Sequence, residues 1–250
     1  MLVGLLLILT LMSIAWSLWI RRYTWTCRWD VAFTISLASV GAGFLLMSPF
    51  ASATLGQWLH SITGLWNLED YLGHDLLIVA STAVAYAMLG RLARGSDLAV
   101  LFRRDVKAPA LVSIPLLLVT FAAGNGVRVY RPDFLMTPCD PWLAAYWVIL
   151  GATLVHLLTY TCRALWIIRR DERSRRTANI YICALSVAST CYAIPGLVAI
   201  TPGPSIGQLR WVVWTGLCLA AIIYSVAAGK AWHDRMRWFA PAPEPDPVHS

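Results

Sequence analysis

Residues 1–22 read MLVGLLLILTLMSIAWSLWIRR, and this stretch decides the class of fold. Its first twenty residues carry no charged side chain, and Arg21 and Arg22 follow them directly. A helix of about 20 apolar residues spans the hydrocarbon core of a bilayer, because that core is about 30 Å thick. A signal peptide carries its basic residues before the apolar run. Here the order is reversed, so we expect a retained first helix with its N-terminus outside.

The remainder of the chain repeats this pattern. Hydrophobic residues make up 58% of the 250 residues and charged residues 13%, against about 25% charged in an ordinary soluble domain. The connecting pieces are too short to hold a soluble core. We therefore expect an all-α polytopic integral membrane protein, a seven-helix transmembrane bundle over residues 1–230 with a short tail at 231–250. The predicted spans are 2–20, 31–50, 71–90, 108–124, 142–168, 178–200 and 211–230.

The positive charge is distributed unevenly between the two predicted sides. Of the 20 Lys and Arg residues, 17 fall on one side, and only Arg128, Arg131 and Arg210 fall on the other. The positive-inside rule then places the N-terminus outside and the C-terminus, with its tail, in the cytoplasm, in a multi-pass cytoplasmic membrane protein. The net charge of +7 follows from topology, so no nucleic-acid partner is expected. Arginine far outnumbers lysine, which is typical of a GC-rich coding sequence and hints at an actinobacterial or actinophage source.

Thirteen tryptophans gather near the predicted helix ends. An indole ring is favoured where hydrocarbon meets the headgroups, because it has an apolar body and one N–H donor. We expect two aromatic belts, one on each side. The cytoplasmic belt comprises Trp16, Trp19, Trp25, Trp29, Trp166, Trp232 and Trp238, and the outer belt Trp58, Trp66, Trp142, Trp147, Trp211 and Trp214.

An amphipathic segment at 54–66 precedes the third span. Leu55, Trp58, Leu59, Ile62, Leu65 and Trp66 recur at helical spacing, whereas the polar residues lie off that face. The segment is too short to span a bilayer, so we expect an interfacial helix on the outer side.

Several helix starts carry capping signals. We expect Asn67 to cap the third span, with Glu69 and Asp70 in its first turn. Asp140 with Pro141, and Ser205 with Gln208, have the spacing of two further caps.

Prolines and small residues give expectations about helix shape and packing. Pro115 and the pair Pro195-Gly196 should weaken or kink the fourth and sixth spans. Ser39 and Gly43 should let the second helix approach a neighbour closely.

His156 is the one ionisable residue predicted to lie deep and buried in a span. It could carry a proton, ligate a haem or metal, or bond to a neighbouring helix. As a purely structural group, it would be a neutral imidazole bonded across the bundle to a residue such as Thr190 or Tyr192. A b-type haem needs a second histidine at the same depth, and none is present, so no cofactor is expected.

The outer pieces contain residue types that enzymes use but no recognisable motif. They are best interpreted as helix caps and solvated loop charges. No phosphate-binding loop, hydrolase, metalloprotease or kinase motif occurs, nor cysteine spacing typical of a metal site. We therefore expect no enzymatic activity, no catalytic residue and no metal. These outer residues are Glu69, Asp70, His74, Asp75, Arg128, Arg131, Asp133, Cys139 and Asp140.

A basic run lies between the fifth and sixth predicted spans. Such a run fixes topology and is also suited to contact anionic lipid headgroups. Its arginines are Arg169, Arg170, Arg173, Arg175 and Arg176.

The order of the predicted spans and one stretch of sequence resemble those of a known family. Leu65–Ala80 reads LWNLEDYLGHDLLIVA, and Asn67-Leu68 with Leu72-Gly73-His74 is similar to a PNL…LLGHLLLL stretch that opens the third span. That stretch belongs to actinobacterial seven-helix membrane proteins described as transporters, of uncharacterised function. Trp66 stands where that family has proline. The resemblance implies a cytoplasmic C-terminal domain, and we expect this chain to lack it.

These features together favour a non-enzymatic membrane sensing or interaction module. A small-solute transporter or permease is the alternative, and an outer-face enzyme is a third. Partners should be the lipid bilayer and another membrane protein or a second copy. Transporters show internal repeats and polar groups at the midplane. A polar cavity reaching mid-membrane would favour transport, and a dry core would favour a module.

Overall fold

The computed structural model describes residues 2–27, 30–93, 95–202 and 205–237, and within these ranges all regular secondary structure is helical. Six helices are long and apolar enough to cross a membrane, or seven if one bent pair counts as a span. The chain is therefore an all-α, multi-pass membrane protein, as predicted. The tail was predicted to begin at 231, but the last helix continues to Arg237. The rest of the predicted tail, from 238 onwards, lies outside the described residues.

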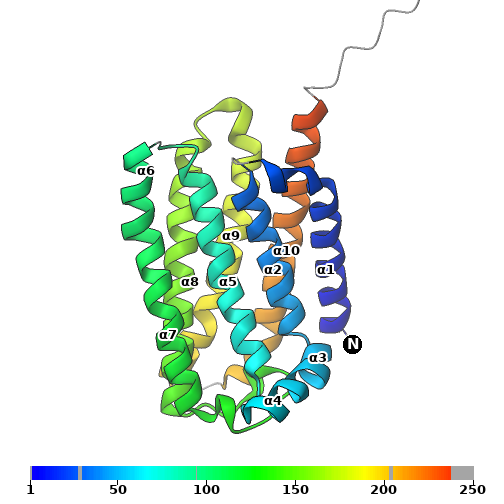
Figure 1. Cartoon of the computed structure of the whole chain (residues 1–250), viewed down its shortest axis with the longest axis vertical. Helices are drawn as coiled ribbons and strands as arrows, with labels where there is room; N and C mark the ends of the chain where they lie inside the picture. The colour runs from blue at the N-terminus through cyan, green and yellow to red at the C-terminus, as the bar shows by residue number, and fades with distance from the viewer. Residues whose placement is uncertain (1, 28–29, 94, 203–204, 238–250) are drawn as a thin grey trace, which may run out of the picture.

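The long helices run roughly side by side along one axis (Figure 1). Five of the seven predicted spans coincide with single helices to within a few residues at most ends. We call the end that carries α3, α4 and residues 124–140 the outer end, and the opposite end the Arg-rich end. The five helices are α1 (Leu2–Ile20), α5 (Leu68–Leu89), α8 (Pro141–Ile168), α9 (Glu172–Ile200) and α10 (Ile206–Arg237).

The fourth predicted span, 108–124, is too short. The helix begins at Gly95 and continues to Ala123, through α6 (Gly95–Phe102), a π-helical turn η3 (Arg103–Lys107) and α7 (Ala108–Ala123). The charged residues of η3 made this segment look like a loop in the sequence. Arg103, Arg104 and Lys107 are nevertheless compatible with a helix, since their exposed side chains reach away from the bundle while the backbone stays helical.

The second predicted span, 31–50, is bent. Helix α2 (Val31–Leu46) meets a segment Pro49–Thr63 at 56°, made of α3 (Pro49–Ala51), a π-helical turn η2 (Ser52–Gly56) and α4 (Gln57–Thr63). Ser48 starts this segment, because its Oγ accepts from the Ala51 N–H at 3.1 Å. The predicted interfacial helix thus begins earlier than residue 54 and ends at Gly64, whose φ is +73°. Trp58 and Ile62 are exposed on its surface.

Glycines bring pairs of helices into close contact. A Cβ on Gly151 of α8 would lie 2.9 Å from the Tyr192 carbonyl, and one on Gly196 of α9 would lie 2.9 Å from the Trp147 carbonyl. Gly43 of α2 faces the Gly73 carbonyl of α5 in the same way, as its spacing predicted. Pro115 and Pro195 lie inside α7 and α9, which continue past them.

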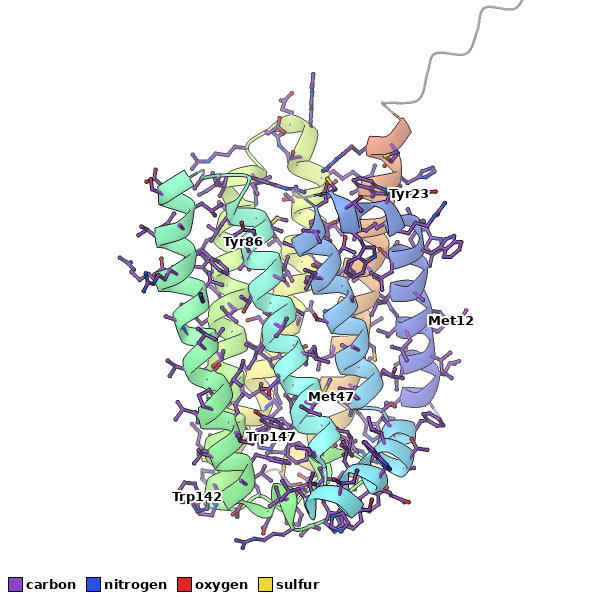
Figure 2. All side chains as sticks on the ribbon, in the orientation of Figure 1. Met12, Tyr23, Met47, Tyr86, Trp142 and Trp147 are labelled. Atoms are coloured by element: carbon purple, nitrogen blue, oxygen red, sulfur yellow. The ribbon has the colours of Figure 1, made fainter. Side chains whose placement is uncertain are left out.

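The aromatic belts are only partly as predicted. Most of the described tryptophans are exposed near helix ends, such as Trp142 at the outer end (Figure 2). Trp147 and Trp214 are different, because only 4% and 8% of their surfaces are exposed. Both lie inside the bundle near the outer end. Trp29 and Trp238 lie outside the described residues.

Candidate functional site

The first turns of α5 carry buried polar side chains at the outer end. Asp70 and His74 are one helical turn apart, so they lie on the same face. Glu69 is fully buried, and Asp70 and His74 expose only 3% and 7% of their surfaces. We name Glu69, Asp70, Asp75 and Asp133 the outer carboxyl cluster. The prediction that these outer residues are caps and solvated loop charges is wrong for Glu69, Asp70 and His74, because they are buried. The segment Pro49–Thr63, which we call the outer segment, and residues 124–140, which we call the outer loop, cover them.

Glu69 packs directly against the π-helical turn η2. A Cβ added to Gly56 would lie 2.6 Å from Glu69 Oε1 and 2.7 Å from Oε2, so only glycine leaves room for the carboxyl group. Neither oxygen has a partner that meets strict hydrogen-bond geometry among the described residues, and the nearest polar side chain is the Ser52 hydroxyl of η2. Glu69 is thus a buried acid in contact with the outer segment.

Asp70 and Asp133 line a small cavity of about 40 Å³ together with His74, Trp147 and Trp214. A buried water needs about 10–15 Å³ of such space, so the cavity has room for a few waters. Asp70 Oδ2 has no partner within the described chain. The cavity thus has a mostly apolar wall, with Asp70, His74 and Asp133 as polar groups that a water could contact.

Asp133 belongs to the outer loop rather than to a span. Its Oδ1 accepts from the Leu135 N–H at 3.1 Å, which begins the short turn η5 (Phe134–Met136). Burial raises the pKa of Asp133, and the Leu135 N–H, Trp214 and the charge of Arg210 offset part of that shift. Asp133 is therefore the loop's contribution to the cluster.

His74 is held by an aromatic shell. Its Nδ1 forms a hydrogen bond with the Tyr146 hydroxyl of α8, at a distance of 2.7 Å. The rings of Trp147 and Phe134 lie 5.4 and 5.9 Å from it. These contacts fix the imidazole in the lining of the cavity that Asp70 and Asp133 also line.

The cluster has no opposite charge in direct contact. None of the four ion pairs within the described residues involves it. No group of three or more metal-ligating side chains is found there or elsewhere in those residues. An unpaired buried carboxylate is costly, so the site is suited to taking up a proton.

Asn67 does not cap α5 as predicted. Its backbone is left-handed, with φ of +56°, and its side chain makes no cap bond. Nδ2 instead donates to the Gly126 and Val129 carbonyls at 2.6 and 2.9 Å, and Oδ1 accepts from the Arg131 N–H at 3.3 Å. Asn67 thus fastens the outer loop over the cluster. The Asp140 cap is confirmed, because its Oδ1 accepts from the Leu143 N–H at 3.0 Å.

His156 lies elsewhere, and its predicted burial is wrong. It is exposed on the bundle surface, and its Nε2 lies 2.8 Å from the Asp105 carbonyl of η3. The predicted partners Thr190 and Tyr192 do not bond to it; Thr190 donates to Ser186 on its own helix. The partner was missed because residues 95–107 were expected to be a loop.

The basic run separates into two groups. Arg173 lines a large cavity at the Arg-rich end, whereas Arg169, Arg170, Arg175 and Arg176 do not line it. Arg169 lies over the Trp166 ring at 3.8 Å.

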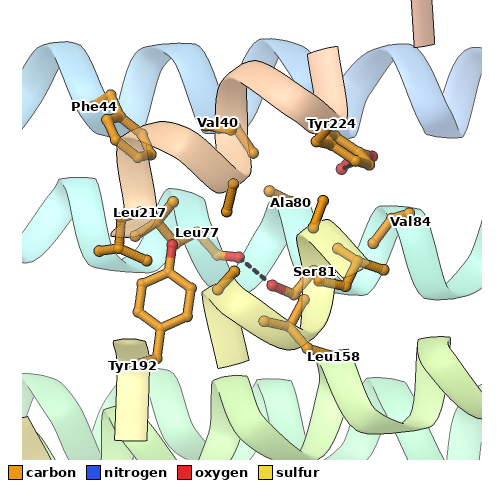
Figure 3. Close-up of a pocket in the computed structure, with 16 residues that line it drawn as sticks. Val40, Phe44, Leu77, Ala80, Ser81, Val84, Leu158, Tyr192, Leu217 and Tyr224 are labelled. Carbon is orange, nitrogen blue, oxygen red and sulfur yellow. Dashed lines mark hydrogen bonds between the residues drawn. The ribbon is translucent and has the colours of Figure 1, made fainter. Parts of the chain in front are cut away.

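A second cavity of about 50 Å³ lies in the middle of the bundle (Figure 3). Its lining is mostly apolar, and the Ser81 hydroxyl is bonded to the Leu77 carbonyl of its own helix at 2.8 Å. Leu77, Tyr192 and Leu217 line both this cavity and the outer one. The two cavities therefore follow each other along the bundle.

The chain matches no protein-family model, no curated protein and no solved structure. Its resemblance to the actinobacterial family stays a prediction.

Proposed function

We propose that this protein is a non-enzymatic membrane sensing module whose sensor is the outer carboxyl cluster. The observation that carries the proposal is Glu69, which is fully buried without a charged partner among the described residues. An ionised carboxylate buried in this way costs several kcal/mol, and binding a proton removes that cost. The free energy of this end of the bundle therefore depends on the proton concentration that reaches it.

The position of the cluster links protonation to a change in structure. Glu69 touches η2 of the outer segment, and Asp70 with Asp133 lines the cavity between α5, the outer loop and α10. The titratable groups facing it are His74 and Tyr71 of α5, Tyr146 of α8 and, acting on Asp133, Arg210 of α10. A charge on Glu69 would repel Asp70 and alter the contact of the carboxyl group with Gly56 and Ser52 of η2, which is the element we expect to move.

Infrared difference spectroscopy of the reconstituted protein tests this proposal. Between mildly acidic and alkaline buffer, we expect a band from protonated carboxyl groups to disappear. Part of that band should be missing in Glu69→Gln, while Asp97→Asn, which changes an exposed acid of α6 at the other end, should keep it whole. If Glu69→Gln and the wild type give the same difference spectrum, Glu69 does not take up the proton.

The transporter alternative has one observation in its favour. The outer and central cavities share three lining residues along the bundle axis, which is the arrangement of a pathway. Their volumes suit a few waters rather than an organic solute, so transport would involve protons. In proteoliposomes carrying a pH-sensitive dye, a sensing module should leave an imposed pH gradient as stable as in empty vesicles. If the wild type collapses the gradient and Asp70→Asn prevents this collapse, the protein transports protons instead.

We also propose the orientation with the cluster outside and the Arg-rich end in the cytoplasm, in the cytoplasmic membrane. Its support is the excess of Lys and Arg at the Arg-rich end. A reporter fused after Ser250 should be active only in the cytoplasm, and one inserted beside Pro132 only outside. The reverse result would make the cluster a sensor of the cytoplasm.

A further inference from the structure

A charged cavity at the Arg-rich end is not used by the proposed sensor. It has a volume of about 650 Å³ and lies where α1, α5, α8 and α10 end and α2 and α9 begin. Figure 1 shows these helix ends gathered at one end of the bundle. Its charged lining consists of Arg21, Arg91, Arg173, Arg235, Asp30 and Asp234.

The positive charges of this cavity exceed its negative charges. Asp30 is already engaged, because its Oδ2 lies 3.0 Å from Arg235 Nη1 and its Oδ1 lies 4.0 Å from Arg21 Nη2. Neither Arg91 nor Arg173 has an ion-pair partner within the described residues. Four guanidinium groups thus face two carboxylates, which leaves the cavity suited to an anion.

Arg21 gives a second, independent indication of a ligand. Its side chain is only 5% exposed, and its Nε has no hydrogen-bond partner among the described residues. The contacts of its other nitrogens are long, at 3.5 Å to the Ala228 carbonyl and 3.4 Å to Thr34 Oγ1. A guanidinium group has five N–H donors in a fixed fork, so this buried group has unused donor capacity.

Aromatic rings hold that guanidinium group in place. Its Cζ lies 5.0 Å from the centroid of the Phe33 ring and 5.5 Å from that of Trp232. A planar group in contact with two rings keeps its orientation before a ligand arrives, which lowers the entropic cost of binding.

We propose that this cavity binds a phosphoryl group, with Arg21, Arg91 and Arg173 as its recognition residues. The guanidinium fork matches phosphate oxygens and gives charge-assisted hydrogen bonds. Thr177 also lines the cavity and adds a hydroxyl donor, whereas the Ser174 hydroxyl already donates to Asp171 Oδ2 at 2.8 Å.

Two sources of the phosphoryl group fit this chemistry, a lipid headgroup and a soluble phosphate. An adjoining cavity of about 630 Å³ shares Asp30, Arg91 and Arg235 and includes the apolar side chains of Leu98 and Phe102. It offers space for an acyl chain beside the headgroup.

Binding to the purified full-length protein in detergent tests the proposal. Native mass spectrometry with phosphatidylglycerol, compared with phosphatidylcholine, tests the lipid source, and a thermal shift with inorganic pyrophosphate tests the soluble source. Retention of phosphatidylglycerol alone assigns the lipid, and stabilisation by pyrophosphate alone assigns the soluble phosphate; either supports a phosphoryl site. Failure of both probes to bind overturns it.

Matched variants separate the cavity from the general surface charge. Arg173→Gln should weaken binding of the successful probe about tenfold or more, as expected from the loss of a charge-assisted hydrogen bond. Arg176→Gln, the same change at an exposed position of α9 outside the cavity, should leave it unchanged. Arg21→Lys keeps the charge but loses the fork, and it should also weaken binding in protein whose thermal midpoint is retained. Equal effects of Arg173→Gln and Arg176→Gln would show surface attraction only and contradict the proposal.

Discussion

Single side chains at the outer end combine burial with missing partners. Glu69 depends on Gly56 for its space, and Asn67 fastens the loop that covers Asp70. In a soluble protein such acids would be in water at a helix start, where they favour the helix dipole. Here the same position is enclosed, so a residue type suited to capping becomes a group whose charge is expensive.

Asp133 allows a pH prediction with a defined sign. Burial raises its pKa in the folded protein, so the folded state holds this proton more tightly than the unfolded state does. The associated stabilisation is complete below the unfolded pKa of about 3.9 and is lost as pH rises through the folded value. Asp133→Asn removes the charge and keeps an oxygen for the Leu135 N–H. We expect a higher thermal midpoint than wild type at neutral pH and no difference in strong acid.

Unfolding of wild type and Asp133→Asn in detergent, followed over a pH series, measures this difference. A variant that is less stable than wild type at neutral pH would show that the ionised carboxylate stabilises the fold.

Helix pairs depend on a few glycines for their distance. Gly151 and Gly196 let α8 and α9 approach each other closely. A Cβ added at either position would lie 2.9 Å from a carbonyl oxygen of the other helix. We expect Gly151→Ala or Gly196→Ala to destabilise the protein by about 1–3 kcal/mol through overpacking, measured as a lower thermal midpoint.

Gly4→Ala of α1 is the matched control, because nothing lies within 4 Å of its added Cβ. It should be neutral or slightly stabilising, since alanine is favoured over glycine in a helix by about 1 kcal/mol. Equal loss of stability in all three variants would contradict the close α8–α9 contact.

Helix ends show what a sequence alone can and cannot predict at this scale. Apolar length predicted most helices because it reflects the bilayer directly. The start of the α6–α7 helix was missed, since Arg103 and Asp105 have a loop-like composition although they lie in a helix. Trp147 and Trp214 were expected in the outer belt but are buried in the bundle. Their burial was missed because the depth of a residue along a helix does not tell which face of the helix it occupies.

The whole bundle separates two kinds of polar site. Among the described residues, the outer end encloses carboxyl groups without charged partners, the middle is mostly apolar, and the opposite end gathers arginines around an open cavity. The acidic residue types were visible in the sequence. Their burial was not, because it arises from contacts between α5, the outer segment and the loop at 124–140, which are far apart along the chain.

The central claim is that proton binding at Glu69 changes the outer segment that it touches. Hydrogen–deuterium exchange of the reconstituted protein, corrected for the intrinsic effect of pH, measures the protection of residues 49–67 directly. We predict that protection falls as pH rises in wild type and in Asp97→Asn, and that it is independent of pH in Glu69→Gln. Protection of this segment that varies with pH equally in wild type and Glu69→Gln would contradict the account.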